Sequence, residues 1–353
     1  MTDLRPRIAK KRRLLLPVIA GSVGLVVVLG LGFREQVRDI YSVVAGLDYT
    51  GGSSETVEFV ISKGETGEDV AKKLVSAGIT KSLDVTLRKM NLLNPTFFPG
   101  TYKIQKQISS QKAIEFLTNP QNILVNRVTI REGLRNKSVF KILSQATDIP
   151  VSTFEREAEK LGQFDIPKVA TNLEGYLYPA TYEFNPGLTA KEILQILVDR
   201  TKEQLVADGI AKVDWHRTLT LASIIQSEAR LTEDFYKVSR TFQNRLAIGM
   251  PLQSDATVNY GVGSEDIYTS NAERNDPNKY NTYLYSGLPI GPIAGAGALA
   301  IDAVLHPAEG KWLYFCTVNL KTGETVFSNT YAEHEKAVAQ WLKWMRENPG
   351  WDD

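Results

Sequence analysis

The chain has 353 residues, enough for about two folded domains at roughly 150 residues each, and its 43% hydrophobic and 23% charged side chains are ordinary for a protein with a packed core. The formal net charge is only +1, and the first thirteen positions hold six basic residues and one acidic residue, so the rest of the chain is mildly acidic. This balance excludes the broad basic surface of a nucleic-acid-binding protein, and the single cysteine, Cys316, excludes an intrachain disulfide.

Residues 14–33 read LLLPVIAGSVGLVVVLGLGF, a run without a charge and about as long as a bilayer-spanning helix. Basic residues precede it and no small-residue cleavage site follows, so we expect an uncleaved transmembrane anchor. The positive-inside rule makes residues 1–13 a cytoplasmic tail and places everything after Arg34 outside the cell membrane. A buried core helix is the alternative, but four glycines in the run disfavour it. ATP, NAD and nucleic acid are therefore not expected as partners.

Residues 34–54 end in DYTGGSS and are predicted to be a flexible linker. Residues 55–120 then show the periodicities of a small α+β domain. The expected elements are a strand at 56–61, helices at 67–77 and 82–92, a strand at 101–104 and a helix at 110–117.

Residues 121–346 are predicted to form a larger mixed α+β domain, with no internal repeat. Its expected helices are 136–146, 152–161, 190–207, 215–230, 298–305, 331–346 and one that Thr232 caps and that runs to about 246. A strand is expected at 123–130, extended or loop structure at 174–184, and a hairpin from 312–318 and 325–327. Region 249–297 reads mostly as loop and short strand.

The segment LASIIQSEAR, residues 221–230, places a carboxylate on an apolar helix face. At 100° per residue, Glu228 lies about 20° from Leu221 and about 40° from Ile224, whereas Gln226 lies about 160° away on the solvent side. Burial and the negative end of the helix dipole both raise the pKa of a carboxyl group. Glu228 is therefore the candidate general acid. The alternative is a structural ion pair, with Arg245 as partner.

Other catalytic constellations are missing from the sequence. Three histidines lack the spacing of metal ligands, a single cysteine cannot build a zinc site, and there is no nucleophile elbow. We expect no metal and no cofactor. Six tyrosines lie near loop signals; half are expected in the core and half would suit stacking on sugar rings. They are Tyr176, Tyr178, Tyr182, Tyr280, Tyr283 and Tyr285.

Five segments in order resemble the endolytic murein transglycosylase family. They are LEGYLYPATYEF (173–184), LASIIQSEA (221–229), NRLAIGMPLQSDATVNYG (244–261), YNTYLYSGLPIGPIAGAG (280–297) and AVLHPAEGKWLYFC (303–316). The likeness runs from the strand at 56 to the last helix and includes the N-terminal anchor. It implies that residues 55–120 are a LysM-like glycan-binding subdomain and residues 121–346 the catalytic domain.

The resemblance implies cleavage within peptidoglycan strands, between N-acetylmuramic acid and N-acetylglucosamine, leaving a 1,6-anhydro end. Glu228 matches the family's catalytic glutamate, at the end of a Glu-Lys-Glu run in which this chain has Gln226 first. A second departure is Ala180, where relatives have Asp. Asp255, Asn281, Tyr283 and Glu174 are predicted to bind substrate. Glycan strands are the expected partner, together with cell-wall synthases, and the expected role is termination of strand growth.

Two other functions fit parts of the sequence. A non-catalytic, membrane-anchored scaffold would need only the glycan-binding subdomain. A water-using muramidase would need a second carboxylate beside Glu228, and the candidates are Glu174 and Asp255. An anhydro end on the product would distinguish the transglycosylase from both.

Overall fold

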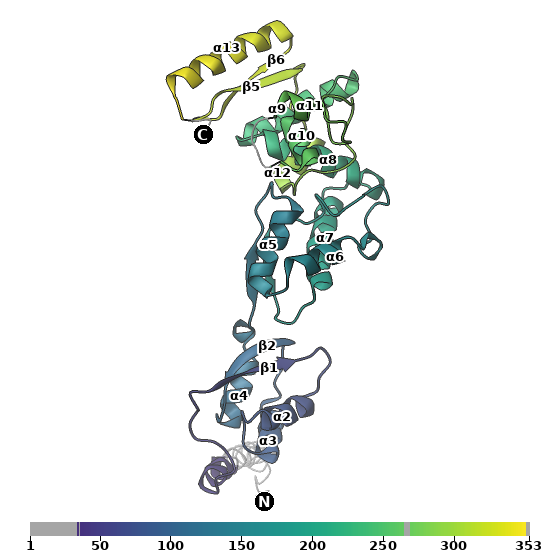
Figure 1. Ribbon diagram of the computed structural model, residues 1–353. Coiled ribbons are helices and arrows are strands. Elements are labelled where there is room, and N and C mark those ends of the chain that lie inside the picture. The colour runs from purple at the N-terminus through teal and green to yellow at the C-terminus, as the bar shows by residue number, and fades with distance from the viewer. Residues whose placement is uncertain (1–33, 35, 265–268, 351–353) are drawn as a thin grey trace, which may run out of the picture. The chain divides into compact units, whose positions relative to one another are not determined.

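The structure is a computed structural model that describes residues 34, 36–264 and 269–350. The chain divides into two compact units, Met1–Val125 and Asn126–Asp353 (Figure 1). The predicted cytoplasmic tail and anchor, residues 1–33, lie outside the described residues. Among the helices of the described part, none is long and apolar enough to cross a membrane. Both units combine helices with two-stranded sheets, which confirms the predicted α+β class.

In the first unit, every element predicted between residues 56 and 117 is present with its ends within one residue. The elements are β1 (Thr56–Ile61), α2 (Gly67–Ser76), α3 (Leu83–Leu93), β2 (Gly100–Gln105), α4 (Ser110–Leu117) and the short 3₁₀ helix η1 (Pro120–Asn122). β1 and β2 pair antiparallel, with Phe59 opposite Tyr102. Because side chains alternate along a strand, Phe59 and Ile61 face inward and pack with Val70 and Leu74 of α2.

Half of the predicted flexible linker is folded onto the first unit. Residues 36–44 are helical, and Asp39 forms ion pairs with Lys89 and Arg88 of α3. Asp48 is buried, and its carboxylate accepts hydrogen bonds from the backbone N–H and the hydroxyl of Ser110 at the start of α4. The glycines and serines that suggested flexibility come only after these contacts, at 51–54.

The second unit holds the remaining elements. They are β3 (Asn126–Thr129), α5 (Asn136–Thr147), α6 (Val151–Ala158), η2 (Leu161–Gln163), β4 (Thr181–Phe184), α7 (Ala190–Ala207), η3 (Lys212–Asp214), α8 (Trp215–Glu228), α9 (Thr232–Ala247), α10 (Asp255–Val262), α11 (Asn271–Arg274), α12 (Ala298–Leu305), β5 (Tyr314–Asn319), β6 (Glu324–Ser328) and α13 (Tyr331–Glu347).

The single strand predicted at 123–130 contributes to both units. Ile123 forms a bridge with Tyr102 of the first unit, whereas Asn126–Thr129 pair antiparallel with β4 in the second. The sequence pattern did not reveal the boundary between the two units, because both halves of the segment read as one strand although each pairs with a different sheet.

Helix α8 is buried on every side for more than half of its length, from Thr218 to Ile225. It packs against α9, α10 and α12, and its Ser223 hydroxyl accepts a hydrogen bond from the backbone N–H of Ile293. The predicted solvent position of Gln226 is wrong: this side chain is partly buried, and its carbonyl accepts from the backbone N–H of Gly297. The loop before α12 covers the face that the helical pattern assigned to water.

Region 249–297 differs from its prediction. It contains helices α10 and α11, and no strand among its described residues. The sequence of α10, DATVNYGV, is poor in strong helix formers, so tertiary contacts rather than propensity hold it. The prediction that Thr232 caps α9 is wrong by one position. Thr232 is the first residue of the helix, its N-cap is Leu231, and no side chain makes a capping hydrogen bond.

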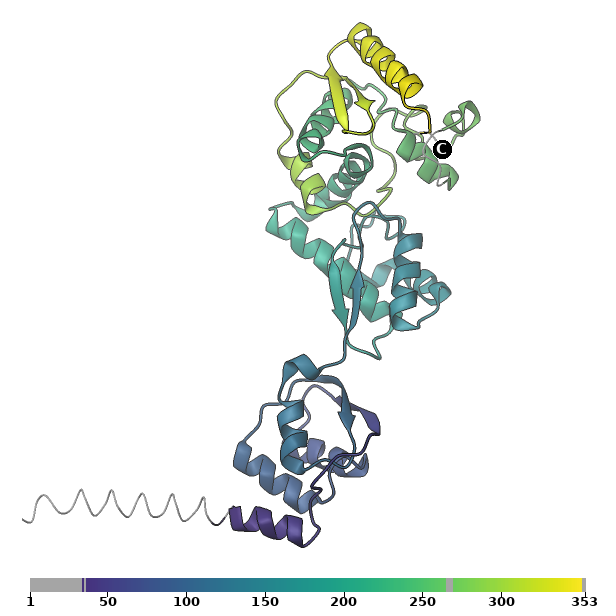
Figure 2. The ribbon, with the colours of Figure 1, turned by 90° about the vertical axis from the view of Figure 1, so that its left-hand side faces the viewer.

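The C-terminal elements form a small layer of their own. β5 and β6 make the predicted hairpin, and α13 packs on β5, as the yellow elements of Figure 2 show. A T-shaped contact between Phe242 of α9 and Phe315 of β5 joins this layer to the helices of the second unit. Cys316 lies half-buried in β5.

Asp48→Asn removes the charge that faces the N-terminus of α4. We expect a loss of about 1–2 kcal/mol, and therefore roughly tenfold faster amide hydrogen exchange in α4. Tryptophan fluorescence does not report on α4, because all five tryptophans lie in the second unit. Hydrogen exchange followed by mass spectrometry measures α4 directly. Glu58→Gln, an exposed carboxylate on β1, is the control. Equal exchange in both variants would contradict the assigned role of Asp48.

Candidate active site

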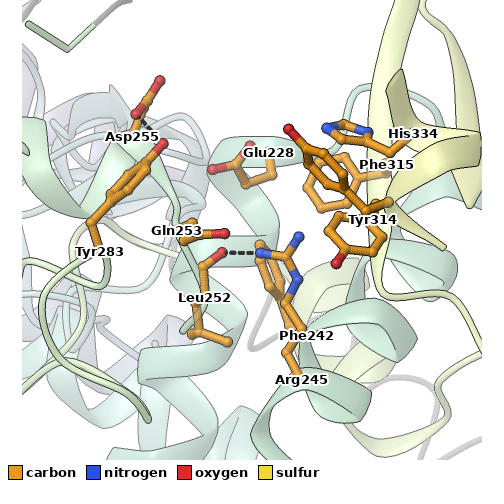
Figure 3. A pocket seen from close by; sticks show the side chains of 11 residues that line it. Glu228, Phe242, Arg245, Leu252, Gln253, Asp255, Tyr283, Tyr314, Phe315 and His334 are labelled. Atoms are coloured by element: carbon orange, nitrogen blue, oxygen red, sulfur yellow. Dashed lines mark hydrogen bonds between the residues drawn. The ribbon is translucent and has the colours of Figure 1, made fainter. Parts of the chain in front are cut away.

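A cavity of about 320 Å³ opens at the C-terminal end of α8 (Figure 3). Three groups of residues line it. Helices α8, α9 and α10 contribute Glu228, Phe242, Arg245 and Asp255; the loops contribute Leu252, Gln253 and Tyr283; and the C-terminal layer contributes Tyr314, Phe315, Tyr331 and His334. The volume falls within the range of small-molecule sites, roughly 300–1,000 Å³.

Glu228 is the last residue of α8 and is partly buried in the cavity wall. Burial raises the pKa of its carboxyl group, and the neighbouring Asp255 carboxylate adds to this effect, while the Ser254 hydrogen bond and the Arg245 charge oppose it. Its place at the negative end of the helix acts in the same direction as burial. The side chain is thus suited to hold a proton and to release it to a bound group.

Ser254 is the direct partner of Glu228, and sequence reasoning missed it. Its hydroxyl donates to Oε1 of Glu228 at 2.6 Å. Ser254 is also the N-cap of α10, where serine normally binds the helix's own backbone, yet it makes no such bond. Its backbone is fixed instead by the hydroxyls of Thr282 and Thr257. The one signal in the sequence was a serine at a helix start.

Arg245 is buried but forms no ion pair with Glu228 in the described part of the chain. Its guanidinium donates to the backbone carbonyls of Leu313 and Leu252 and lies 5.3 Å from the ring centre of Tyr314. These contacts tie the loop after α9 to the C-terminal layer. The structural alternative for Glu228, a pair with Arg245, is therefore wrong.

Asp255 begins α10 and faces the same cavity, but both of its oxygens are engaged. Oδ1 accepts from the hydroxyls of Tyr283 at 2.7 Å and Thr269 at 2.6 Å, and Oδ2 pairs with Arg274 at 3.2 Å. Burial and the Asp255 hydrogen bond raise the pKa of Tyr283, so its phenol stays protonated. Asp255 thereby orients an aromatic ring that lines the cavity.

Asn281 does not line the cavity among the described residues. It is buried, its amide donates to the carbonyls of Arg274 and Asp276, and its Oδ1 accepts from the backbone N–H groups of Tyr283 and Leu284. The predicted substrate-binding residue therefore shapes the loop that presents Tyr283.

Gln253 and His334 are two cavity residues that the sequence did not single out. Gln253 has a φ of 52°, a left-handed backbone that is strained for a residue with a side chain and often marks a functional site. His334 stacks on Tyr314 at 5.3 Å, and its buried Nδ1 has no hydrogen-bond partner. Burial and the Arg245 charge lower the pKa of His334, which keeps the ring neutral and able to accept a hydrogen bond.

Glu174 lies in a second cavity, of about 330 Å³, with Tyr260, Asn136 and Asn172 in its lining. Its oxygens accept from the backbone N–H of Asn136 and from the hydroxyl of Tyr260. Burial raises its pKa to about 7. The structure therefore does not bring Glu174 to the Glu228 cavity.

The tyrosine prediction holds for the core half: Tyr176, Tyr178 and Tyr182 are buried in the second unit. Of the others, Tyr283 alone lines the Glu228 cavity among the described residues, and Tyr314 and Tyr331 were missed. Across the described residues, no group of three or more histidine, cysteine or acidic side chains is placed to hold a metal ion. The cavity thus offers one proton-carrying carboxyl group, hydrogen-bonding groups and aromatic faces, as a carbohydrate site would.

Comparisons with known proteins agree with this chemistry. The family model described as "YceG-like family" matches residues 59–340. An endolytic murein transglycosylase of Bacillus subtilis (strain 168) is 30% identical over 322 residues, which cover 84% of this chain and 87% of that protein. The Streptococcus pneumoniae (strain ATCC BAA-255 / R6) protein of the same name is 25% identical over 324 residues, 82% of this chain but 59% of that longer protein.

A crystal structure of a YceG-like protein from Listeria monocytogenes matches with a TM-score of 0.54 and 26% identity. The match covers 80% of this chain and 99% of that one.

The buried Glu174 carboxyl group makes stability depend on pH. Its pKa in the folded chain is about 7 against an ordinary value of 4.5, so folding favours the protonated form and stability falls as pH rises from about 4.5 through 7. The full cost is about 3 kcal/mol. Glu174→Gln removes it, so the stability of the variant relative to wild type should rise by about this amount between pH 5 and pH 8.

Urea unfolding of residues 34–353, followed by tryptophan fluorescence, measures the difference. Glu159→Gln is the control, since this exposed carboxylate lines the same cavity. A Glu174→Gln curve that stays parallel to wild type across the pH range would refute the assignment.

Proposed function

The chain belongs to the YceG-like family, and on this premise we propose that it is an endolytic murein transglycosylase. The name is that of the relatives it matches over most of its length. The observation that carries the proposal is Glu228: a partly buried carboxyl group of raised pKa, hydrogen-bonded to Ser254, in the wall of an aromatic-lined cavity.

The proposed reaction cuts the bond between N-acetylmuramic acid and N-acetylglucosamine inside a glycan strand. Protonated Glu228 gives its proton to the glycosidic oxygen as the bond from that oxygen to C1 breaks. The Glu228 carboxylate then takes the proton of the C6 hydroxyl of the same muramic acid, whose oxygen bonds to C1 and closes the 1,6-anhydro ring. Because the nucleophile is already attached, little entropy is lost, and no water or cofactor is consumed.

The surroundings of Glu228 favour this one-carboxylate route over hydrolysis. A conventional glycosidase uses a second carboxylate as base or nucleophile. Of the two candidates, Glu174 lies in another cavity, and Asp255 is occupied by Tyr283, Thr269 and Arg274. Asp255 is thus proposed to position Tyr283, while Tyr283, Gln253 and His334 contact the sugar.

The other parts of the chain complete the proposal. The order β1, α2, α3, β2 supports a LysM-like glycan-binding role for the first unit. The apolar run at 14–33 supports a single-pass anchor in the cell membrane, with the N-terminus in the cytoplasm and both units outside. Such an enzyme would end growing strands next to the wall synthases.

Glu228→Gln should abolish the formation of anhydro-muramyl ends while leaving the fold intact, because the amide cannot donate or take up the catalytic proton. Mass spectrometry of uncross-linked glycan strands incubated with residues 34–353 measures the product. Glu233→Gln, an exposed carboxylate in the first turn of α9, should keep activity. Anhydro ends made by Glu228→Gln would move the acid elsewhere; reducing ends made by wild type would indicate a hydrolase; binding without cleavage would indicate a scaffold.

Ser254→Ala should move the alkaline limb of kcat/KM to higher pH. The Ser254 hydroxyl stabilises the ionised form of Glu228 and so lowers its pKa. Without this donor the protonated acid persists to higher pH, because the ionised carboxylate loses a hydrogen bond that stabilises it. The control is Ser227→Ala, whose exposed hydroxyl bonds within α8. A limb that coincides with wild type would show that Ser254 does not set the proton affinity of Glu228.

A further inference from the structure

The helix at residues 36–44 places two polar side chains against the protein and most of its large apolar side chains on the outer side. Asp39 and the buried Ser42 lie on the inner side, where Asp39 pairs with Lys89 and Arg88 of α3. This helix is the purple N-terminal element of the first unit in Figures 1 and 2. In a water-soluble protein, a helix on the surface shows the opposite arrangement.

Four large apolar side chains form what we call the outer stripe: Val37, Ile40, Tyr41 and Val44. Their spacing of i, i+3, i+4 and i+7 gathers them within an arc of about 100°. Their exposed fractions are 49%, 65%, 66% and 81%. An exposed apolar stripe of this regularity is typical of a surface that binds a membrane or another protein.

The position of the helix in the chain indicates that the outer stripe faces a membrane. The apolar run at 14–33 ends three residues before the helix begins, so a chain anchored by this run must place residues 36–44 at the membrane surface. Arg34 directly follows the apolar run, and Arg38 lies about 60° around the helix from Tyr41, at one edge of the outer stripe. Cations beside an apolar stripe are typical of helices that lie on anionic lipid, and Tyr41 suits the headgroup level.

We propose that the outer stripe binds the lipid surface next to the anchor, with the helix lying in the plane of the interface. The ion pairs of Asp39 and the Asp48–Ser110 hydrogen bonds then hold the first unit against the membrane in one orientation. The inference rests on the proposed membrane anchor. It adds a second lipid contact whose role is to orient the glycan-binding unit rather than to retain the protein.

The test uses the full chain with Cys316→Ser, which removes the single cysteine. Val37→Cys and Val44→Cys each receive a nitrobenzoxadiazole probe, and the labelled chains enter vesicles of equal parts phosphatidylglycerol and phosphatidylcholine. A nitroxide lipid, labelled near the top of its acyl chain, quenches probes that touch lipid. The matched control is Val60→Cys, an exposed valine of β1 on the same unit.

Probes at Val37 and Val44 should be quenched several-fold more strongly than the probe at Val60. Equal quenching at all three sites would overturn the proposal. Blue-shifted emission without quenching, rising with protein density, would overturn it in favour of a second copy covering the outer stripe. A probe at Val26→Cys, within the predicted anchor, reports insertion separately. Quenching there but not at Val44 refutes only the outer-stripe contact, and product analysis on the same vesicles tests catalysis independently.

Discussion

A carboxyl group at the end of a buried helix is the constraint around which the second unit is organised. Packing on all sides fixes α8, so the position of Glu228 is set by the core and not by a loop. Burial would then make the ionised form of Glu228 costly unless a hydrogen-bond donor or a positive charge stabilised it. Ser254 supplies one short hydrogen bond, which stabilises the carboxylate without a full opposite charge. Burial and the Ser254 hydrogen bond thus act on the Glu228 pKa in opposite directions, which suits the proposed role of an acid that later serves as a base.

The use made of Arg245 follows from the same requirement. A guanidinium in contact with Glu228 would hold the carboxylate ionised and lower its pKa. Here backbone carbonyls of Leu313 and Leu252 take the hydrogen bonds of Arg245, so the charge acts on Glu228 only from a distance. The same bonds join the loop before α10 to the hairpin. One residue thus assembles the cavity wall and leaves the acid unpaired.

The sequence predicted what periodicity and local signals encode. The elements between residues 56 and 117, together with α7, α12 and α13, stand where their patterns placed them, because stop signals and regular apolar spacing indicated their ends. Glu228 could be predicted as the candidate acid because it is the one carboxylate on the apolar face of its helix. Helix α10 did not emerge, since its residues favour helix weakly and its contacts come from distant segments.

The remaining errors concern which groups meet in space. Gln226 was assigned to water because a helical pattern cannot show the loop that binds it. Glu174 and Asn281 were grouped with Glu228 on resemblance, yet the fold places one in another cavity and the other inside a loop. Ser254 and His334 matched no catalytic motif, because their importance comes from partners that are 26 and 20 residues away along the chain.

The order in which the cavity is built has a consequence for synthesis. Glu228 and Ser254 precede Tyr314 and His334 along the chain, and these late residues supply one wall of the cavity. A chain that is still being synthesised contains Glu228 before it contains the residues of that wall. Nascent or C-terminally shortened chains would therefore hold Glu228 against water instead of aromatic rings. The aromatic wall beside Glu228 is therefore complete only when the last helix has folded.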